Sequence, residues 1–196
     1  MLNFLQLWIA GFTNPARLVG EIKCKPAPQW GFYAQLLRGL MDSLLLYLPL
    51  FLMGKAPPTP SNISFIPTGQ YYGALIFLAP IVFFAQWLLG AAWFHVALRW
   101  RKHPSDIDLI LNLTGMATLI SGTLLLVWDW FWLLRGGIDQ NTLGITHLII
   151  DGWWIVIVLI GLKKFFNTPL GFGVMIILAA FALVLPSAIM FMRSPI

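Results

Sequence analysis

Residues 109–134 read LILNLTGMATLISGTLLLVWDWFWLL, and this stretch decides the fold. Asp129 is the one ionisable side chain within it. An α-helix rises about 1.5 Å per residue, so a helix of this length extends about 39 Å, which exceeds the roughly 30 Å hydrocarbon core of a bilayer. The stretch therefore predicts a transmembrane helix.

Four more apolar stretches have lengths near or above the roughly 18 residues that a spanning helix needs. They are Leu36–Met53, Tyr72–Leu98, Ile145–Leu162 and Phe172–Met192. The chain is 59% hydrophobic and only 10% charged, whereas a soluble domain carries about 25% charged residues. The sequence predicts an all-α polytopic membrane helix bundle with five transmembrane helices. We expect one integral membrane domain over residues 1–196, with the bundle in 34–196.

Residues 1–33 form a pre-membrane segment. Its apolar residues recur at helical spacing, and Thr13-Asn14-Pro15 predicts the end of a first helix and the start of a second. Residues 1–12 reach only about 18 Å as a helix and are too short to cross the membrane. We expect an N-terminal interfacial amphipathic helix in the headgroup region. The alternative is a helix packed on the cytoplasmic end of the bundle.

Positive charges favour alternate ends of the five stretches. Nine Lys and Arg residues flank one side and three the other. Because positive residues stay on the cytoplasmic side, we expect a cytoplasmic N-terminus and an external C-terminus. This placement accounts for the net charge of +5 without nucleic acid. The nine are Arg17, Lys23, Lys25 and Arg38 before the first stretch, Arg99, Arg101 and Lys102 after the second, and Lys163 and Lys164 after the fourth.

Ionisable residues inside a membrane are costly, so each one needs an explanation. Asp129 and Asp151 each lie about 9 Å inside the outer ends of the third and fourth stretches. His147 precedes Asp151 by one helical turn and shares its face. Because a short connection joins the two stretches, we expect Asp129, His147 and Asp151 to form a polar cluster. The cluster is either a proton, cation or metal site or a polar contact between two helices.

A second polar group is expected near the inner ends of the spans. Asp42 in the first stretch and His95 in the second lie at similar predicted depths and form a candidate inner pair. Arg38 precedes Asp42 by one turn, and we expect its side chain to extend to the headgroups. An inner pair and an outer trio would line a proton path.

Motifs of known cofactor and metal sites are absent from the sequence. It has no Walker loop, no Gly-x-Gly-x-x-Gly, no His-Glu-x-x-His and no Gly-x-Ser-x-Gly. We therefore expect no cofactor, no resident metal and no enzymatic activity.

Several short motifs resemble those of the Yip family of five-span membrane proteins. They are Asn14-Pro15-Ala16-Arg17, the small-residue run Leu89-Gly90-Ala91-Ala92-Trp93-Phe94-His95, and Trp153-Trp154 followed by Gly161-Leu162-Lys163-Lys164. The resemblance implies a five-span protein with a cytoplasmic N-terminus and no catalytic residues. Eukaryotic members act in vesicle traffic and associate with Rab-type GTPases through a long N-terminal region. This chain has only 33 residues there and resembles the compact prokaryotic members, which implies a prokaryotic cell membrane.

The sequence is compatible with three alternative functions. The first is a Yip-like protein that organises the membrane or scaffolds partners in it. Its partners would be membrane lipids, other membrane proteins or further copies of the chain. The second is a small permease or ion-coupled transporter that uses Asp129, His147 and Asp151. The third is a lipid enzyme, for which the sequence offers no nucleophile and base.

Overall fold

A computed structural model describes residues 3–25, 27–57 and 65–191. Over these residues the chain is helical and has no strand. Five segments are long and apolar enough to cross a membrane, so the chain is an integral membrane protein. They are Gln29–Leu52, Thr68–Trp100, Ile107–Arg135, Gln140–Phe166 and Leu170–Ala188. Met192, Arg193 and the C-terminus lie outside the described residues.

The helices follow one another along the chain, and residues 53–67 form the longest connection between them. Two short helices, α1 (Phe4–Thr13) and α2 (Pro15–Ile22), precede the bundle. The first span joins α3 (Gln29–Asp42), the π-helix η1 (Ser43–Tyr47) and α4 (Leu48–Leu52). The remaining spans are η2 (Thr68–Gln70) with α5 (Tyr71–Trp100), α6 (Ile107–Arg135), α7 (Gln140–Phe166) and α8 (Leu170–Phe191).

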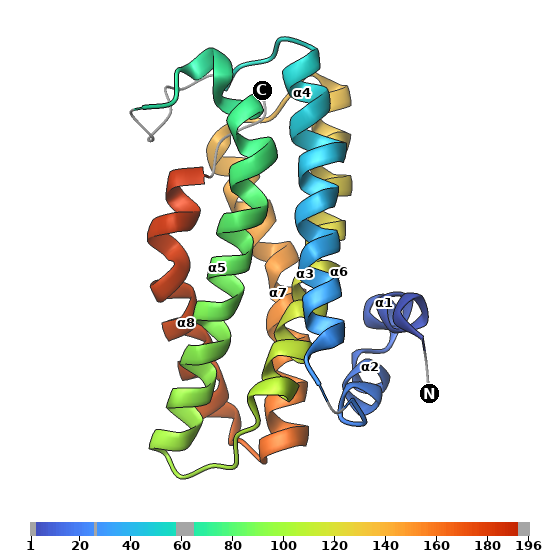
Figure 1. Cartoon of the computed structure of the whole chain (residues 1–196), viewed down its shortest axis with the longest axis vertical. Helices are drawn as coiled ribbons and strands as arrows, with labels where there is room; N and C mark the ends of the chain where they lie inside the picture. The colour runs from blue at the N-terminus through green and yellow to red at the C-terminus, as the bar shows by residue number, and fades with distance from the viewer. Residues whose placement is uncertain (1–2, 26, 58–64, 192–196) are drawn as a thin grey trace.

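The five spans lie side by side as an upright bundle, and α6 lies behind α3 in the view of Figure 1. In the most apolar part of α6, 67% of the residues are buried, against 39% or less in the other spans. The α5–α6 and α7–α8 connections lie at the lower end in Figure 1, and the α6–α7 connection lies at the upper end. Most polar and small side chains of α6 are therefore buried against neighbouring helices, among them Asn112, Ser121 and Asp129.

Several helices begin at a polar residue whose side chain accepts hydrogen bonds from backbone amides of the first turn. Asn3 and Gln6 cap α1 reciprocally, and the side chain of Asn14 accepts from the Arg17 amide. Asn14 therefore ends α1 and starts α2, as the Thr13-Asn14-Pro15 motif predicts. Asp106 accepts from two amides in the first turn of α6, and Asp139 accepts from the amide of Thr142 in α7.

Close contact between α3 and α6 depends on Gly31 and Gly115. A Cβ on Gly31 would lie 2.2 Å from the carbonyl oxygen of Leu111, and a Cβ on Gly115 would lie 2.6 Å from the Gly31 Cα. Asn112 of α6 accepts from the Gly31 amide at 2.8 Å and donates to the Ala27 carbonyl at 2.8 Å. This fully buried amide therefore satisfies backbone groups at the start of α3.

Pro80 inside α5 has no N–H to donate to the carbonyl of Ile76, four residues earlier. The Ser43 hydroxyl of η1 donates to this oxygen at 2.8 Å. An unpaired carbonyl costs several kcal/mol inside a membrane, so this hydrogen bond stabilises the contact between the first two spans.

Pro49 also leaves a backbone carbonyl of the first span without its helical N–H donor. It has no N–H for the carbonyl of Leu45, and the indole Nε1 of Trp130 donates to that oxygen at 2.7 Å. This bond joins the first span to α6 near the upper end of the bundle.

The α1–α2 hairpin packs on the side of the bundle's lower half rather than beneath its end (Figure 1). The carbonyl of Gly11 accepts from Trp153 Nε1 at 2.9 Å, and a Cβ on Gly11 would meet Ile120, near the midpoint of α6. Leu5 and Ile9 on the outer face of α1 are each 57% exposed. Because α1 is apolar on both its faces, it suits contact with lipid tails as well as with the bundle.

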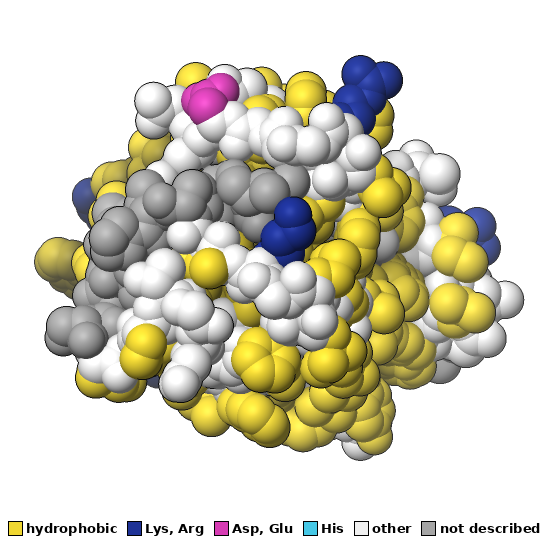
Figure 2. Space-filling view, turned by 90° about the horizontal axis from the view of Figure 1, so that it is seen from above, with side chains coloured by type: hydrophobic (Ala, Val, Ile, Leu, Met, Phe, Trp, Pro, Cys, Tyr) yellow, Lys and Arg dark blue, Asp and Glu magenta, His cyan; other side chains and the backbone are white. Residues whose placement is uncertain are grey.

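The sides of the bundle expose apolar side chains. Leu148 and Ile149 of α7 are 70% and 72% exposed, which a membrane-facing surface permits. Figure 2, which looks onto the upper end, shows hydrophobic side chains along the flanks and few charged ones.

Candidate functional site

A cavity with two adjoining chambers lies between the spans, and the exposed side chains of Leu148 and Leu185 form part of its wall. The tyrosine chamber has a volume of about 250 Å³ and reaches Tyr47, Tyr71 and Tyr72 toward the upper end. The tryptophan chamber has a volume of about 450 Å³ and reaches Trp87 and Trp154. Both are lined by Arg38, Phe83, Gln86, Leu125, His147 and Ala188. All five spans contribute side chains to the cavity.

Asp129 and His147 meet beside the cavity. The carboxylate Oδ1 of Asp129 on α6 lies 2.7 Å from Nε2 of His147 on α7. Their side chains are 12% and 21% exposed, so the surrounding helices enclose most of the pair. An imidazole and a carboxylate at hydrogen-bond distance can hold a proton between them.

Asp151 lies one turn beyond His147 on α7 and lines the tryptophan chamber. Its carboxylate accepts no hydrogen bond from another residue in the described part of the chain, and Asp129 faces the other chamber. The structure therefore bonds Asp129 to His147 and leaves Asp151 outside this hydrogen bond, although His147 and Asp151 line the same chamber. Within the described ranges, no group of three or more His, Cys, Asp or Glu side chains is placed to hold a metal ion.

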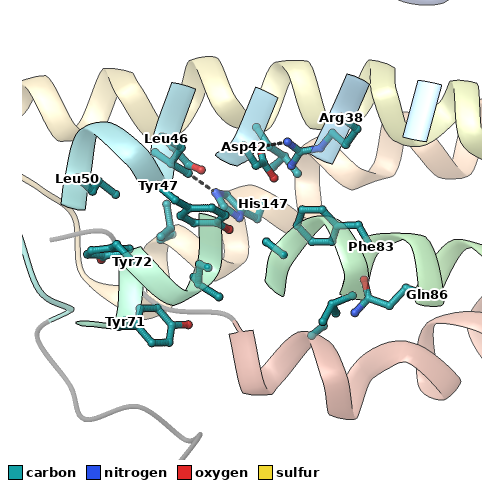
Figure 3. Close-up of a pocket in the computed structure, with 17 residues that line it drawn as sticks. Arg38, Asp42, Leu46, Tyr47, Leu50, Tyr71, Tyr72, Phe83, Gln86 and His147 are labelled. Atoms are coloured by element: carbon teal, nitrogen blue, oxygen red, sulfur yellow. Dashed lines mark hydrogen bonds and ion pairs between the residues drawn. The ribbon is translucent and has the colours of Figure 1, made fainter. Parts of the chain in front are cut away.

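Arg38 and Asp42 form a buried ion pair inside the first span. Arg38 Nη1 donates to Asp42 Oδ1, and the two residues are 8% and 3% exposed. The guanidinium carbon lies 5.4 Å from the centre of the Phe83 ring. Figure 3 shows this pair on α3, opposite Phe83 and Gln86 of α5. The expectation that Arg38 extends to the headgroups is wrong, because the first span begins at Gln29 and not near Arg38.

Gly122 makes room for the guanidinium. A Cβ at this position would lie 1.8 Å from Nε of Arg38. Arg38 therefore lies directly against the backbone of α6. The Arg38–Asp42 spacing of one turn was visible in the sequence, but the partner glycine on another helix was not.

The candidate inner pair of Asp42 and His95 is not formed. Asp42 lies 13 residues after Gln29, about 20 Å along the first span, and borders the tyrosine chamber. His95 lies five residues before the end of α5, and its Nδ1 is 2.8 Å from the Ser105 hydroxyl. The error follows from the start of the first span, which placed Asp42 too close to the inner end.

The π-helix η1 follows Asp42 directly and carries Tyr47 toward the cavity. A single π turn inside an α-helix shifts the following side chains around the axis, and such turns are frequent at functional sites. Tyr47 stacks on Tyr72 with ring centres 6.4 Å apart. Nothing in the sequence marked this turn, because π turns have no strong residue signature.

The charged groups around the cavity do not cancel. Arg38 is neutralised by Asp42, and Asp129 is paired with His147. Asp151 adds a further carboxylate. With a neutral imidazole, the cavity carries an excess of negative charge, which favours protons and cations over anions.

No family model matches the chain, and no match was found among the curated proteins or the solved structures. Functional assignment therefore depends on the cavity and its side chains.

Proposed function

We propose that the chain is a small proton- or cation-coupled permease in which the Asp129–His147 pair takes up and releases a proton beside the cavity. The observation that carries this proposal is the 2.7 Å contact between Asp129 Oδ1 and His147 Nε2 on two different spans. Ionisable residues inside membrane spans are rare and costly, and they mark many proton and ion pathways.

The cavity supports this function because it has room for water or a small ligand near the pair. A water molecule occupies about 30 Å³ in the liquid, and the chambers measure about 250 and 450 Å³. A water-filled path along polar side chains lets a proton reach the pair without an exposed charge in lipid. The negative excess of the cavity favours the entry of a positive species.

Proton flux into liposomes tests the proposal. The purified chain is reconstituted with a pH-sensitive dye inside the vesicles, and the external pH is lowered. We expect the wild type to acidify the lumen faster than protein-free vesicles, and the His147→Gln variant to lose at least tenfold of this rate. Gln keeps a hydrogen-bonding group of similar length but cannot titrate.

The Asp108→Asn variant is the matched control, because Asp108 lies in the first turn of α6, outside the residues that line the cavity. Its flux is expected to equal that of the wild type. An absence of flux in the wild type, or equal flux in His147→Gln, would contradict the permease proposal.

A Yip-like scaffold is the second candidate, in which the chain organises lipids or holds partners and carries no enzymatic activity. The positions of the Yip-like motifs favour it. Trp153 donates to the Gly11 carbonyl, His95 contacts Ser105, and a Cβ on Gly161 would lie 2.2 Å from Leu113. Such contacts stabilise the bundle rather than serve transport. A scaffold moves no protons, so the liposome assay separates the two candidates.

For either function, the orientation that fits best has the N-terminus in the cytoplasm of a prokaryotic cell and the C-terminus outside. With Arg38 inside the first span, the remaining Lys and Arg residues still favour the lower end of the bundle. Lys163 and Lys164 end α7 there, and Arg99 lies in the last turn of α5. A C-terminal fluorescent reporter that matures only in the cytoplasm is expected to stay dark. Bright cells would contradict this orientation.

A further inference from the structure

Gln35 presents an unsatisfied acceptor inside the bundle. The residue is 1% exposed and lines the tryptophan chamber. Its Nε2 donates to the Phe83 carbonyl at 3.0 Å, whereas its Oε1 has no hydrogen-bond partner among the described residues. A buried polar atom without a partner costs about 1–3 kcal/mol, so it is rarely left unpaired without a reason. A donor supplied by a bound molecule is such a reason.

Asp151 adds a second acceptor to the same chamber. Its carboxylate receives no hydrogen bond from the residues that the structure describes, and it lines the chamber together with Gln35. An ionised carboxylate and an amide oxygen accept hydrogen bonds and donate none. The free polar groups of the chamber therefore require a ligand that donates.

Aromatic rings form much of the remaining wall. Trp154 packs against Phe94 and Phe181 with ring centres 6.3 and 5.4 Å away. The indole N–H groups of Trp87 and Trp154 are already bonded to Thr114 and Thr118 at 3.1 Å. These tryptophans therefore offer apolar faces, which pack against hydrocarbon and attract cations.

The charges that face the chamber come from three helices. On α3, Arg38 is paired with Asp42, and on α7, His147 is paired with Asp129 of α6. Asp151 is the carboxylate left over. An anion would meet this charge without a free cation to bind, whereas an ammonium group would neutralise it.

We propose that the tryptophan chamber binds a protonated primary or secondary amine with an apolar body. The ammonium group lies at Asp151, one of its N–H groups donates to Gln35 Oε1, and the apolar body packs on Trp87, Phe94 and Trp154. The chamber volume of about 450 Å³ lies within the range of about 300–1,000 Å³ that is usual for small-molecule sites. This inference deepens the proposed permease function by naming its substrate class.

Direct binding to the full chain in lipid nanodiscs tests the inference. The probes are radiolabelled 2-phenylethylamine and its N,N,N-trimethyl derivative, which has the same charge and ring but no N–H donor. We expect the amine to bind the wild type at least tenfold more tightly than the trimethyl derivative. Equal affinities, or no binding of the amine, would overturn the inference. This comparison needs no variant.

Three variants locate the site. Asp151→Asn is expected to weaken amine binding at least tenfold, and Asp151→Glu is expected to retain most of it. Gln35→Met conserves volume and removes the acceptor, so it is expected to weaken binding of the amine and leave the trimethyl derivative unchanged. Asp108→Asn is the control and is expected to bind like the wild type. Unchanged amine binding in both Asp151→Asn and Gln35→Met would overturn the assignment.

The binding assay tests the amine site and the flux assay tests the permease function, so either proposal can be contradicted without the other. Amine binding without proton flux in liposomes would contradict the permease function and support the amine site. Proton flux without amine binding would support the permease and overturn the amine site.

Discussion

His147 Nε2 and Asp129 Oδ1 lie 2.7 Å apart and connect α7 to α6 at the edge of an intramembrane cavity. The two residues are 18 positions apart in sequence, across the short α6–α7 connection. Both side chains are largely enclosed by the surrounding helices and border the cavity. The contact is thus a bond between two spans and also a titratable group inside the membrane.

Gly122 is expected to be essential for the position of Arg38. In Gly122→Ala, the new methyl group would lie 1.8 Å from Arg38 Nε and force the guanidinium away from Asp42. We expect a loss of about 2–3 kcal/mol in stability, measured by unfolding in detergent. Gly152→Ala is the control, since no atom lies within 4 Å of its Cβ position, and it should be neutral or stabilising. Similar stabilities for the two variants would show that Arg38 does not depend on this glycine.

Ser43 is expected to compensate for Pro80. Ser43→Ala removes the donor to the Ile76 carbonyl and is expected to cost about 1 kcal/mol. In a Pro80→Ala background, the restored N–H of residue 80 can bond this carbonyl, so the same change should cost at least about 0.5 kcal/mol less. A double-mutant cycle of unfolding free energies measures the coupling. Strictly additive effects would contradict the link.

Asp139 is expected to make the start of α7 sensitive to acid. The hydrogen bonds from Thr142 hold the pKa of this exposed carboxyl below its usual value of 3.8. Because the folded pKa is lowered, the cap contributes fully above the unfolded pKa and is lost as pH falls through the folded value. The protection factors of the amides of residues 141–143, which compare observed with intrinsic exchange at each pH, should therefore fall below about pH 4. In Asp139→Asn the cap does not titrate, and this fall should disappear; its persistence would assign the effect to another group.

The five spans were predictable from the sequence because hydrophobic length alone identifies them. The approach of Asp129 to the helix face that carries His147 and Asp151 was predictable too, because a short connection joins the two helices. The predicted depth matched Asp129 with Asp151, whereas α7 begins at Gln140 and Asp129 bonds His147. The start of the first span was not predictable from the sequence. Gln35, Arg38 and Asp42 interrupt the run of apolar residues there, although all three are buried in the structure. Their burial depends on partners in other helices, such as Gly122 and Phe83.

Other features also depended on tertiary contacts. The depth of α1 follows from its packing on Ile120 and Trp153, which no local pattern reveals. The carbonyls freed by Pro49 and Pro80 were predictable, but the side chains that satisfy them come from other spans. The preference of His147 for Asp129 over Asp151 as its hydrogen-bond partner likewise depends on how the helices pack.

The most direct test of the account compares proton flux in liposomes for the wild type, Asp129→Glu and Asp129→Asn. Asparagine can still accept a hydrogen bond from His147, so all three proteins are expected to unfold at similar temperatures. We predict that Asp129→Glu retains most of the flux because it keeps a carboxylate, and that Asp129→Asn loses at least tenfold. Flux in Asp129→Asn equal to that of the wild type would contradict the claim that this pair carries the proton.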